Sequence, residues 1–203
     1  VDPNALPMLL RDFGVDIRAD PRVKAMIAIS GRRANVTTAE EAIKQIDVPS
    51  EVPKDIELTA YFGVGSDAAE PGAQSPPADL QSTVGTLKST FPFKSYYLLD
   101  ALSLRARSGV GADTSGQLSG LRLTTFRVGS ASVEPDGQTI RLDRLHAGMK
   151  IPIGESGKTS FIDTGVSTEV VSVKEGQKLV IGRSSLDGPT KALFLILIAK
   201  VVP

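Results

Sequence analysis

The hydrophobic pattern is strongest near the C-terminus, where apolar residues run without interruption from Ala192 to Ala199. This run is too short for a membrane-spanning helix, which needs about 20 apolar residues, and it lacks the alternation of a lipid-facing barrel strand. A strand that is covered on both faces has such a pattern. We therefore expect a central strand of the main sheet at 191–202, with 178–181 as its hairpin neighbour.

The first part of the chain mixes helical and extended patterns. Apolar residues at helical spacing over 6–13 predict a short helix that ends at Gly14. The segments 15–17 and 23–30 then predict two strands, because an Asp-Pro turn separates them.

A second helix follows these strands. Thr37 and Thr38 begin two overlapping capping boxes with Glu40 and Glu41, so the helix is expected to begin there with both glutamates in its first turn. The helix is expected to end near Asp47-Val48-Pro49 and to complete a small α–β–β–α module over 1–49.

A short connector at 50–53 contains a proline and directly follows another one, which predicts a fairly stiff linker and a domain boundary. The second domain is then 54–203. Its first part is expected to run strand, mobile Gly/Pro-rich loop, helix and strand, over 56–64, 65–77, about 78–90 and 96–106.

From there on, all patterns are short and extended. The pair Asp136-Gly137 is a strong tight-turn signal, so 130–133 and 139–145 should form a hairpin. Further strands are expected at 118–128, 149–153, 161–162, 166–173 and 178–181. The predicted fold class is α+β: the small α–β–β–α module, followed by a predominantly antiparallel β sandwich or barrel-like domain that carries one helix.

Composition narrows the classes of function. The 203 residues contain 23 Lys plus Arg and 23 Asp plus Glu, so no excess positive charge attracts nucleic acid. The absence of cysteine excludes disulfides, thiolate metal sites and a cysteine nucleophile. Because the sequence opens on Val1-Asp2-Pro3 without a basic leader or apolar signal segment, we expect a processed or trimmed chain.

No set of residues converges on a chemical reaction. Residues 154–159 end like a phosphate-binding loop, but Pro152 stands where that motif needs a glycine, and a Gly-rich hairpin turn explains them better. His146 is the only histidine, which removes multi-histidine metal sites and favours a surface or turn position. We predict no catalytic residue, no cofactor and no metal site.

Four of the ten aromatic residues gather in one short stretch: Phe91, Phe93, Tyr96 and Tyr97. Two interpretations are open. Core packing is favoured, and a partner-binding patch is the alternative if the side chains are exposed.

Residues 15–31, VDIRADPRVKAMIAISG, lead into a helix that closes on IKQIDVP. This stretch resembles the small periplasmic ring-forming domain that precedes the pore of bacterial secretins, where an ADPR strand, a glycine and a helix closing on I-x-x-L-D-x-P recur. Residues 177–182 and 193–202 also resemble the last core strands of a secretin. The Val-Pro-x-Leu-Gly-x-Ile-Pro element and the long alternating hairpins of a pore are not recognised, which favours a degenerate relative.

The resemblance implies a non-enzymatic cell-envelope protein, periplasmic or associated with the outer membrane, that acts in assembly or secretion through protein partners or self-association. Neither nucleic acid nor a transmembrane helix is expected. The alternative is a small-ligand-binding β domain in which the 65–77 loop acts as a lid over a cavity.

Overall fold

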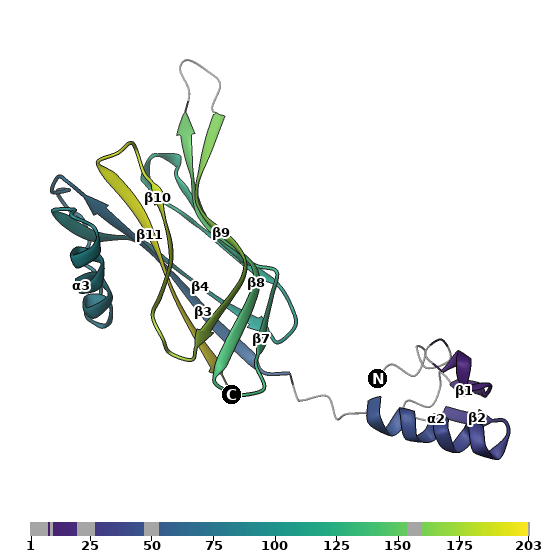
Figure 1. The fold of residues 1–203 in the computed structure, drawn as a ribbon. Helices are drawn as coiled ribbons and strands as arrows, with labels where there is room; N and C mark the ends of the chain where they lie inside the picture. Colours follow the sequence, from purple (N-terminus) through teal and green to yellow (C-terminus); the bar gives the residue numbers. More distant parts are fainter. Residues whose placement is uncertain (1–7, 9, 20–26, 47–52, 154–159, 203) are drawn as a thin grey trace. The chain divides into compact units, whose positions relative to one another are not determined.

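The computed structural model describes residues 8, 10–19, 27–46, 53–153 and 160–202. The chain divides into two compact units, Val1–Val52 and Pro53–Pro203. We describe each unit by itself (Figure 1).

The described residues of the first unit form a short 3₁₀ helix, a two-stranded antiparallel sheet and a 14-residue α-helix. These elements are η1 (Arg11–Phe13), β1 (Asp16–Ala19), β2 (Ile27–Ser30) and α2 (Arg33–Ile46). Gly14 ends η1 with a φ of 62°, as expected for a residue in the left-handed region. The earlier part of the helix expected at 6–13, the beginning of the strand expected at 23–30 and the predicted linker at 50–52 lie outside the described residues.

The helix α2 begins earlier than the capping boxes predicted. Thr37 and Thr38 lie inside it, and their hydroxyl groups donate to the carbonyl oxygens of Arg33 and Ala34, one turn back, at 3.0 Å each. A threonine can satisfy its hydroxyl in this way within a helix as well as at a cap. The prediction of a cap was therefore wrong, and the first turn holds no acidic residue.

The second unit consists of two antiparallel sheets and one helix. The four-stranded sheet has the order β10-β11-β3-β4, formed by Leu179–Ser185, Lys191–Val202, Asp55–Ser66 and Ser95–Arg107. The five-stranded sheet has the order β5-β6-β8-β7, with β9 also paired to β8. Its strands are β5 (Ala112–Gln117), β6 (Leu123–Val128), β7 (Ser130–Val133), β8 (Thr139–Ile153) and β9 (Ser160–Lys174). The predicted α+β class with an antiparallel sandwich is confirmed.

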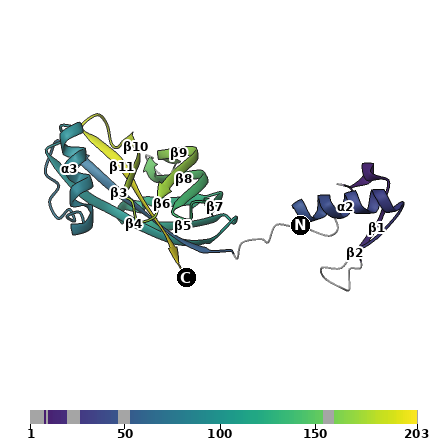
Figure 2. The same cartoon turned by 60° about the horizontal axis from the view of Figure 1, so that its bottom comes forward.

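The strand β11 has both faces buried, as its sequence predicts. Leu193, Leu195 and Leu197 belong to the core between the two sheets. Phe194 and Ile196 point the opposite way, where η2 (Ala78–Leu80) and α3 (Gln81–Thr90) cover the sheet. Figure 2 shows α3 lying against the four-stranded sheet. Its hairpin partner is β10, also as predicted.

Two strands are longer than the patterns indicated. The segment expected as two strands at 139–145 and 149–153 is the single strand β8, and β9 likewise joins 161–162 to 166–173. The change of pattern in β8 comes from Arg144, whose φ of 50° produces a local irregularity where the neighbour of β8 changes from β7 to β6. The hairpin of β7 and β8 around the Asp-Gly turn is confirmed.

One strand was missed and another was placed too early. The strand β5 consists of small and polar residues, so no apolar alternation marks it. The strand expected at 118–128 begins only at Leu123, because Gly120 and Leu121 have positive φ values of 70° and 61°. These two residues belong to the short 3₁₀ helix η3 (Ser119–Leu121).

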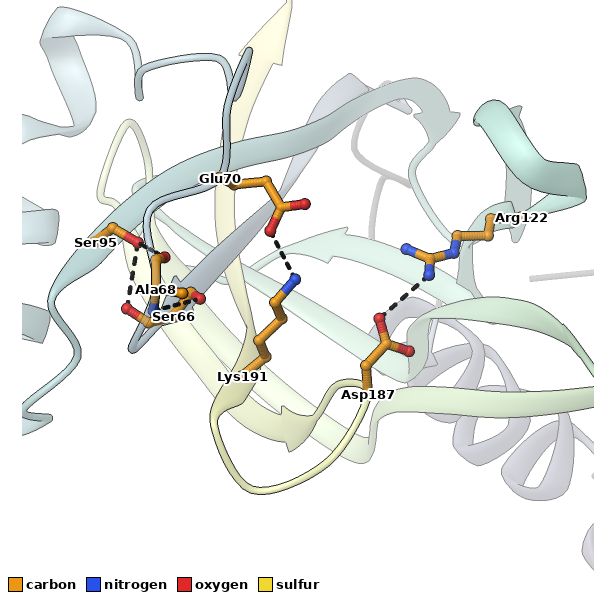
Figure 3. A network of polar contacts seen from close by, with 7 residues as sticks. All are labelled: Ser66, Ala68, Glu70, Ser95, Arg122, Asp187 and Lys191. Atoms are coloured by element: carbon orange, nitrogen blue, oxygen red, sulfur yellow. Dashed lines mark hydrogen bonds and ion pairs between the residues drawn. The ribbon is translucent and has the colours of Figure 1, made fainter.

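The loop between β3 and η2 is fastened to the sandwich by polar contacts (Figure 3). Lys191 donates to Glu70 across 2.7 Å, and the hydroxyl group of Ser95 donates to the carbonyl oxygens of Ser66 and Ala68 at 3.2 and 2.8 Å. The composition of the loop did not predict these bonds.

We predict that Leu195→Ala lowers the free energy of unfolding by about 3 kcal/mol, because it leaves a cavity between two packed sheets. Chemical denaturation followed by circular dichroism measures this loss. The matched control, Lys200→Ala, removes an exposed side chain from the same strand and should change stability by less than about 0.5 kcal/mol. Equal effects of both substitutions would contradict the buried position of Leu195.

Candidate functional site

Three of the four aromatic residues that the sequence singled out lie together on the outer face of the four-stranded sheet. The ring centroids of Phe91, Phe93 and Tyr96 lie 5.2, 6.1 and 6.0 Å from that of Phe194. The guanidinium carbon of Arg183 lies 5.4 Å from the Phe91 ring and 5.6 Å from the Phe93 ring, within range of a cation–π interaction. We call these five residues the aromatic cluster.

Tyr97 does not join this cluster. Successive residues of a strand point to opposite faces, so Tyr96 faces the aromatic cluster while Tyr97 packs against the core between the sheets. The predicted four-residue patch is therefore divided by the sheet. All four side chains are half-buried, and binding of a partner by them stays a prediction.

The hydroxyl group of Tyr96 also completes the end of α3. It donates to the carbonyl oxygens of Leu87 and Phe91 at 3.1 and 2.8 Å, which also accept from the backbone N–H groups of Phe91 and Phe93. Burial raises the pKa of Tyr96, and the charge of Arg183 opposes this effect.

The cavity beneath α3 and the loop before it is very small. Its volume is about 10 Å³, and apolar side chains such as Leu80 and Val84 line it together with Phe194. One water molecule needs about this much space, whereas small-molecule pockets measure roughly 300–1,000 Å³. This site gives no support to the alternative of a ligand-binding domain with 65–77 as a lid.

His146 lies in the middle of β8 on the outer face of the five-stranded sheet, half-buried, and its Nδ1 is hydrogen-bonded to Ser167 at 2.8 Å. It is thus a surface residue, as expected. Glu40 and Glu41 are exposed on α2 in the other unit. Residues 154–159, which end like a phosphate-binding loop, lie outside the described residues.

Three of the seven exposed large apolar side chains among the described residues gather at the end of the β8–β9 hairpin, which sequence reasoning missed. We define the hairpin end as 151–153 and 160–162. Ile153, Phe161 and Ile162 are 45%, 48% and 51% exposed. The sequence signal that could have indicated this surface is a pair of short apolar runs on either side of a Gly-containing segment. Figure 1 shows this hairpin extending beyond the neighbouring strands.

Among the described residues, the hairpin end also has no neighbouring strand on its outer sides. The ladder between β6 and β8 ends at the pair of Leu123 and Lys150. On the other side, Thr164 is the residue nearest the tip that bonds to β10 in the described part of the chain, with its hydroxyl 2.8 Å from that of Ser184. The backbone groups at both margins of the hairpin end are therefore open to another strand.

Polar contacts join other parts of the sandwich. Gln74 covers the edge of β4 by accepting a hydrogen bond from the backbone of Leu98 at 2.8 Å. Where β4 meets the other sheet, the hydroxyl group of Thr124 donates to Asp100, and Gly116 leaves the space that this contact needs. The hairpin end combines a group of exposed apolar side chains with strands that, among the described residues, pair only with each other.

Comparisons with known proteins agree with this architecture. No protein-family model matches the chain, and no curated protein matches it. Among solved structures, the chain is similar to the ETEC secretin GspD in its complex with the pilotin AspS, with a TM-score of 0.52 and 13% identity over 99% of this chain and 60% of that chain. It is also similar to the V. cholerae type IV competence pilus secretin PilQ, with a TM-score of 0.51 and 13% identity over 93% of this chain and 69% of that chain.

These similarities show that the chain has a secretin-like fold, and they confirm at the level of the fold the resemblance seen in the sequence. The chain spans 60% of the length of the GspD chain. In the described parts of the chain, no helix combines the length and apolar character that crossing a bilayer demands.

We predict that Tyr96→Phe lowers the free energy of unfolding at neutral pH by about 1 kcal/mol, because the end of α3 loses two hydrogen bonds. Thermal and chemical unfolding measure the loss. Tyr97→Phe is the control, since the Tyr97 hydroxyl makes no hydrogen bond to any residue that the structure describes. An equally large effect of Tyr97→Phe would contradict the assignment.

The raised pKa of Tyr96 also sets the direction of a pH effect. The folded protein favours the neutral phenol, so this stabilisation is complete below the ordinary pKa of about 10 and is lost as the pH rises past it. The stability of the wild type should therefore fall more steeply than that of Tyr96→Phe above that pH. Parallel declines would show that Tyr96 titrates alike in the folded and unfolded states.

Proposed function

We propose that this chain is a non-enzymatic, secretin-like component of a bacterial cell envelope, which acts in assembly or secretion through protein–protein contacts. Its place would be the periplasm or the inner side of the outer membrane. The observation that carries the proposal is the hairpin end, where exposed apolar side chains and open backbone edges occur together in a secretin-like fold.

A strand edge with free backbone groups tends to pair with another strand. Soluble proteins usually protect such edges by charge, proline or a covering segment. Pro152 has no N–H and protects the β8 margin in part, whereas 160–162 contains neither proline nor charge. In the hairpin end, Ile151 faces Ile162 across the strands, and Pro152 faces Phe161. Both faces are therefore apolar, and a neighbouring hairpin would satisfy the backbone and cover side chains at once.

The geometry of such pairing favours several copies over two. The β8 margin of one hairpin would meet the β9 margin of the next, so the contact joins two different surfaces. Contacts of this head-to-tail kind generate closed rings when the rotation between copies closes. One contact would be weak, because each hairpin end offers few residues, and a ring would add many such contacts together.

The first unit offers a second contact surface. It contains only a two-stranded sheet in its described part, β1 with β2, beside the helix α2. Such a small sheet is marginally stable in isolation and gains from packing against a neighbour. We therefore propose that the exposed edges of this unit also take part in side-by-side packing.

No catalytic step belongs to this proposal. The sequence has one histidine and no cysteine. His146 has a serine as its hydrogen-bond partner, which orients the ring without providing an acid–base pair. Binding and assembly are functions that these features support without further chemistry.

The proposal predicts self-association that depends on the hairpin end. The double substitution Phe161→Ser and Ile162→Ser removes exposed apolar side chains from both faces and should weaken association at least about tenfold, without loss of thermal stability. Light scattering over a concentration series on the whole chain measures the change in mass.

The control is Val110→Ser, which removes an exposed apolar side chain from the loop after β4 and should associate like the wild type. A wild type that stays strictly monomeric at high concentration would count against the proposal. So would a double variant that associates as strongly as the wild type.

A further inference from the structure

A polar hollow of about 370 Å³ lies on the outer face of the five-stranded sheet, away from the core. Four strands contribute to this face in register. One row across them contains Asp113, Arg127, His146 and Ser167, each paired with the next. We call the cavity the polar hollow. It lies where β6 is still paired with β8, so it does not include the hairpin end.

Between the lining residues His146 and Lys150, β8 contains Gly148, and we call Gly148 and its partner Gly165 the floor. Gly148 on β8 pairs with Gly165 on β9. A Cβ atom on Gly165 would lie 2.5 Å from the carbonyl oxygen of Ala147, and one on Gly148 would lie 2.8 Å from that of Thr164. Larger residues would therefore push the two backbones apart. Glycine at both positions therefore allows the close approach of β8 and β9 beside His146.

The imidazole of His146 is held over this floor. Its Nδ1 is bonded to the hydroxyl group of Ser167 at 2.8 Å. Its Nε2 lies 3.4 Å from the point where a Cβ atom of Gly148 would be. One nitrogen is therefore fixed by the protein, and the other is directed at the space above the glycines. A protonated imidazole would donate from both nitrogens, one to Ser167 and one into the hollow.

Two cations flank the same space. Arg127 lies on β6, where it is paired with His146. Lys150 lies on β8, two residues after Gly148, where it is paired with Asp163. Both cations are exposed, and neither is within ion-pair distance of a carboxylate among the residues that the structure describes. Arg127 and Lys150 therefore have donors that are available to a ligand.

The carboxylates decide which kind of anion fits. Asp113 and Asp163 lie on the outer strands β5 and β9, so the formal charges around the polar hollow sum to zero when His146 is neutral. Long-range attraction of an extended polyanion is weak under these conditions. A single compact anion between the two central strands would instead meet donors at short range, where hydrogen bonds to charged groups are strongest.

We propose that the polar hollow binds one phosphate group, held by Arg127, the Nε2 of His146 and Lys150 above the Gly148–Gly165 floor. Two cationic side chains and an imidazole nitrogen offer several donors, which suit the several oxygens of a tetrahedral oxyanion better than the planar pair of a carboxylate. The group belongs either to free phosphate or to a lipid headgroup. This inference does not depend on self-association or on the hairpin end.

The test uses the single histidine as a probe. In the ¹⁵N-labelled full chain, addition of inorganic phosphate at a mildly acidic pH should shift the imidazole resonances of His146 in a saturable way, with a dissociation constant on the order of 1 mM. Sodium chloride at the same ionic strength should not do so. The amide spectrum recorded in parallel shows whether each variant is folded.

Arg127→Gln and Lys150→Gln should each weaken phosphate binding by about 10-fold or more, because each removes a charged hydrogen-bond donor. The matched control is Lys88→Gln, which removes an exposed cation from α3 and should bind as the wild type does. The absence of a saturable shift, an equal shift with chloride, or unchanged binding by both folded variants would overturn the proposal.

A second arm distinguishes the two sources of phosphate. Vesicles of phosphatidylcholine with phosphatidylglycerol would be floated with the wild type and with Arg127→Gln. Binding to these vesicles that is lost in the variant would assign a lipid headgroup. Phosphate binding in solution without vesicle binding would assign a free phosphate group.

Discussion

Burial of both faces of β11 is the constraint on which the second unit depends. Eight consecutive apolar residues cannot be hidden by one sheet, because their side chains alternate between its faces. The inner face needs the five-stranded sheet, and the outer face needs α3 with its preceding turn. At roughly 1.5–3 kcal/mol for each fully buried side chain, this strand outweighs any single polar contact in the unit. The five-stranded sheet and α3 thus bury the two faces of the same strand.

The same packing explains where the unit is incomplete. The sandwich covers its core, and polar contacts join Gln74 to β4 and Thr164 of β9 to Ser184 of β10. The strands β8 and β9 continue past their neighbours, so the hairpin end has apolar side chains but no second layer. A fold similar to GspD and PilQ at 13% identity therefore combines a closed core with one open extension. Assembly would complete the extension without disturbing the core.

The sequence predicted the features that depend on strong local signals. The uninterrupted apolar run gave β11, helical spacing with prolines gave the helix near 78–90, and Asp136-Gly137 gave the hairpin of β7 and β8. It failed where tertiary contacts override local preference. Thr37 suits a cap as well as a helix interior. The residues of β5 form a strand because they pair with β6. The pairing that places glycines beneath His146 depends on register, which no local pattern specifies.

The central claim is that the sandwich is complete by itself and that the hairpin end is completed by another copy. Amide hydrogen–deuterium exchange of the whole chain at low and high protein concentration tests both halves of this claim together. The amides of β11 should be strongly protected at both concentrations. Those of 151–153 and 160–162 should exchange quickly when dilute and slowly when concentrated. Equal exchange of the hairpin end at both concentrations would contradict the account, as would rapid exchange in β11.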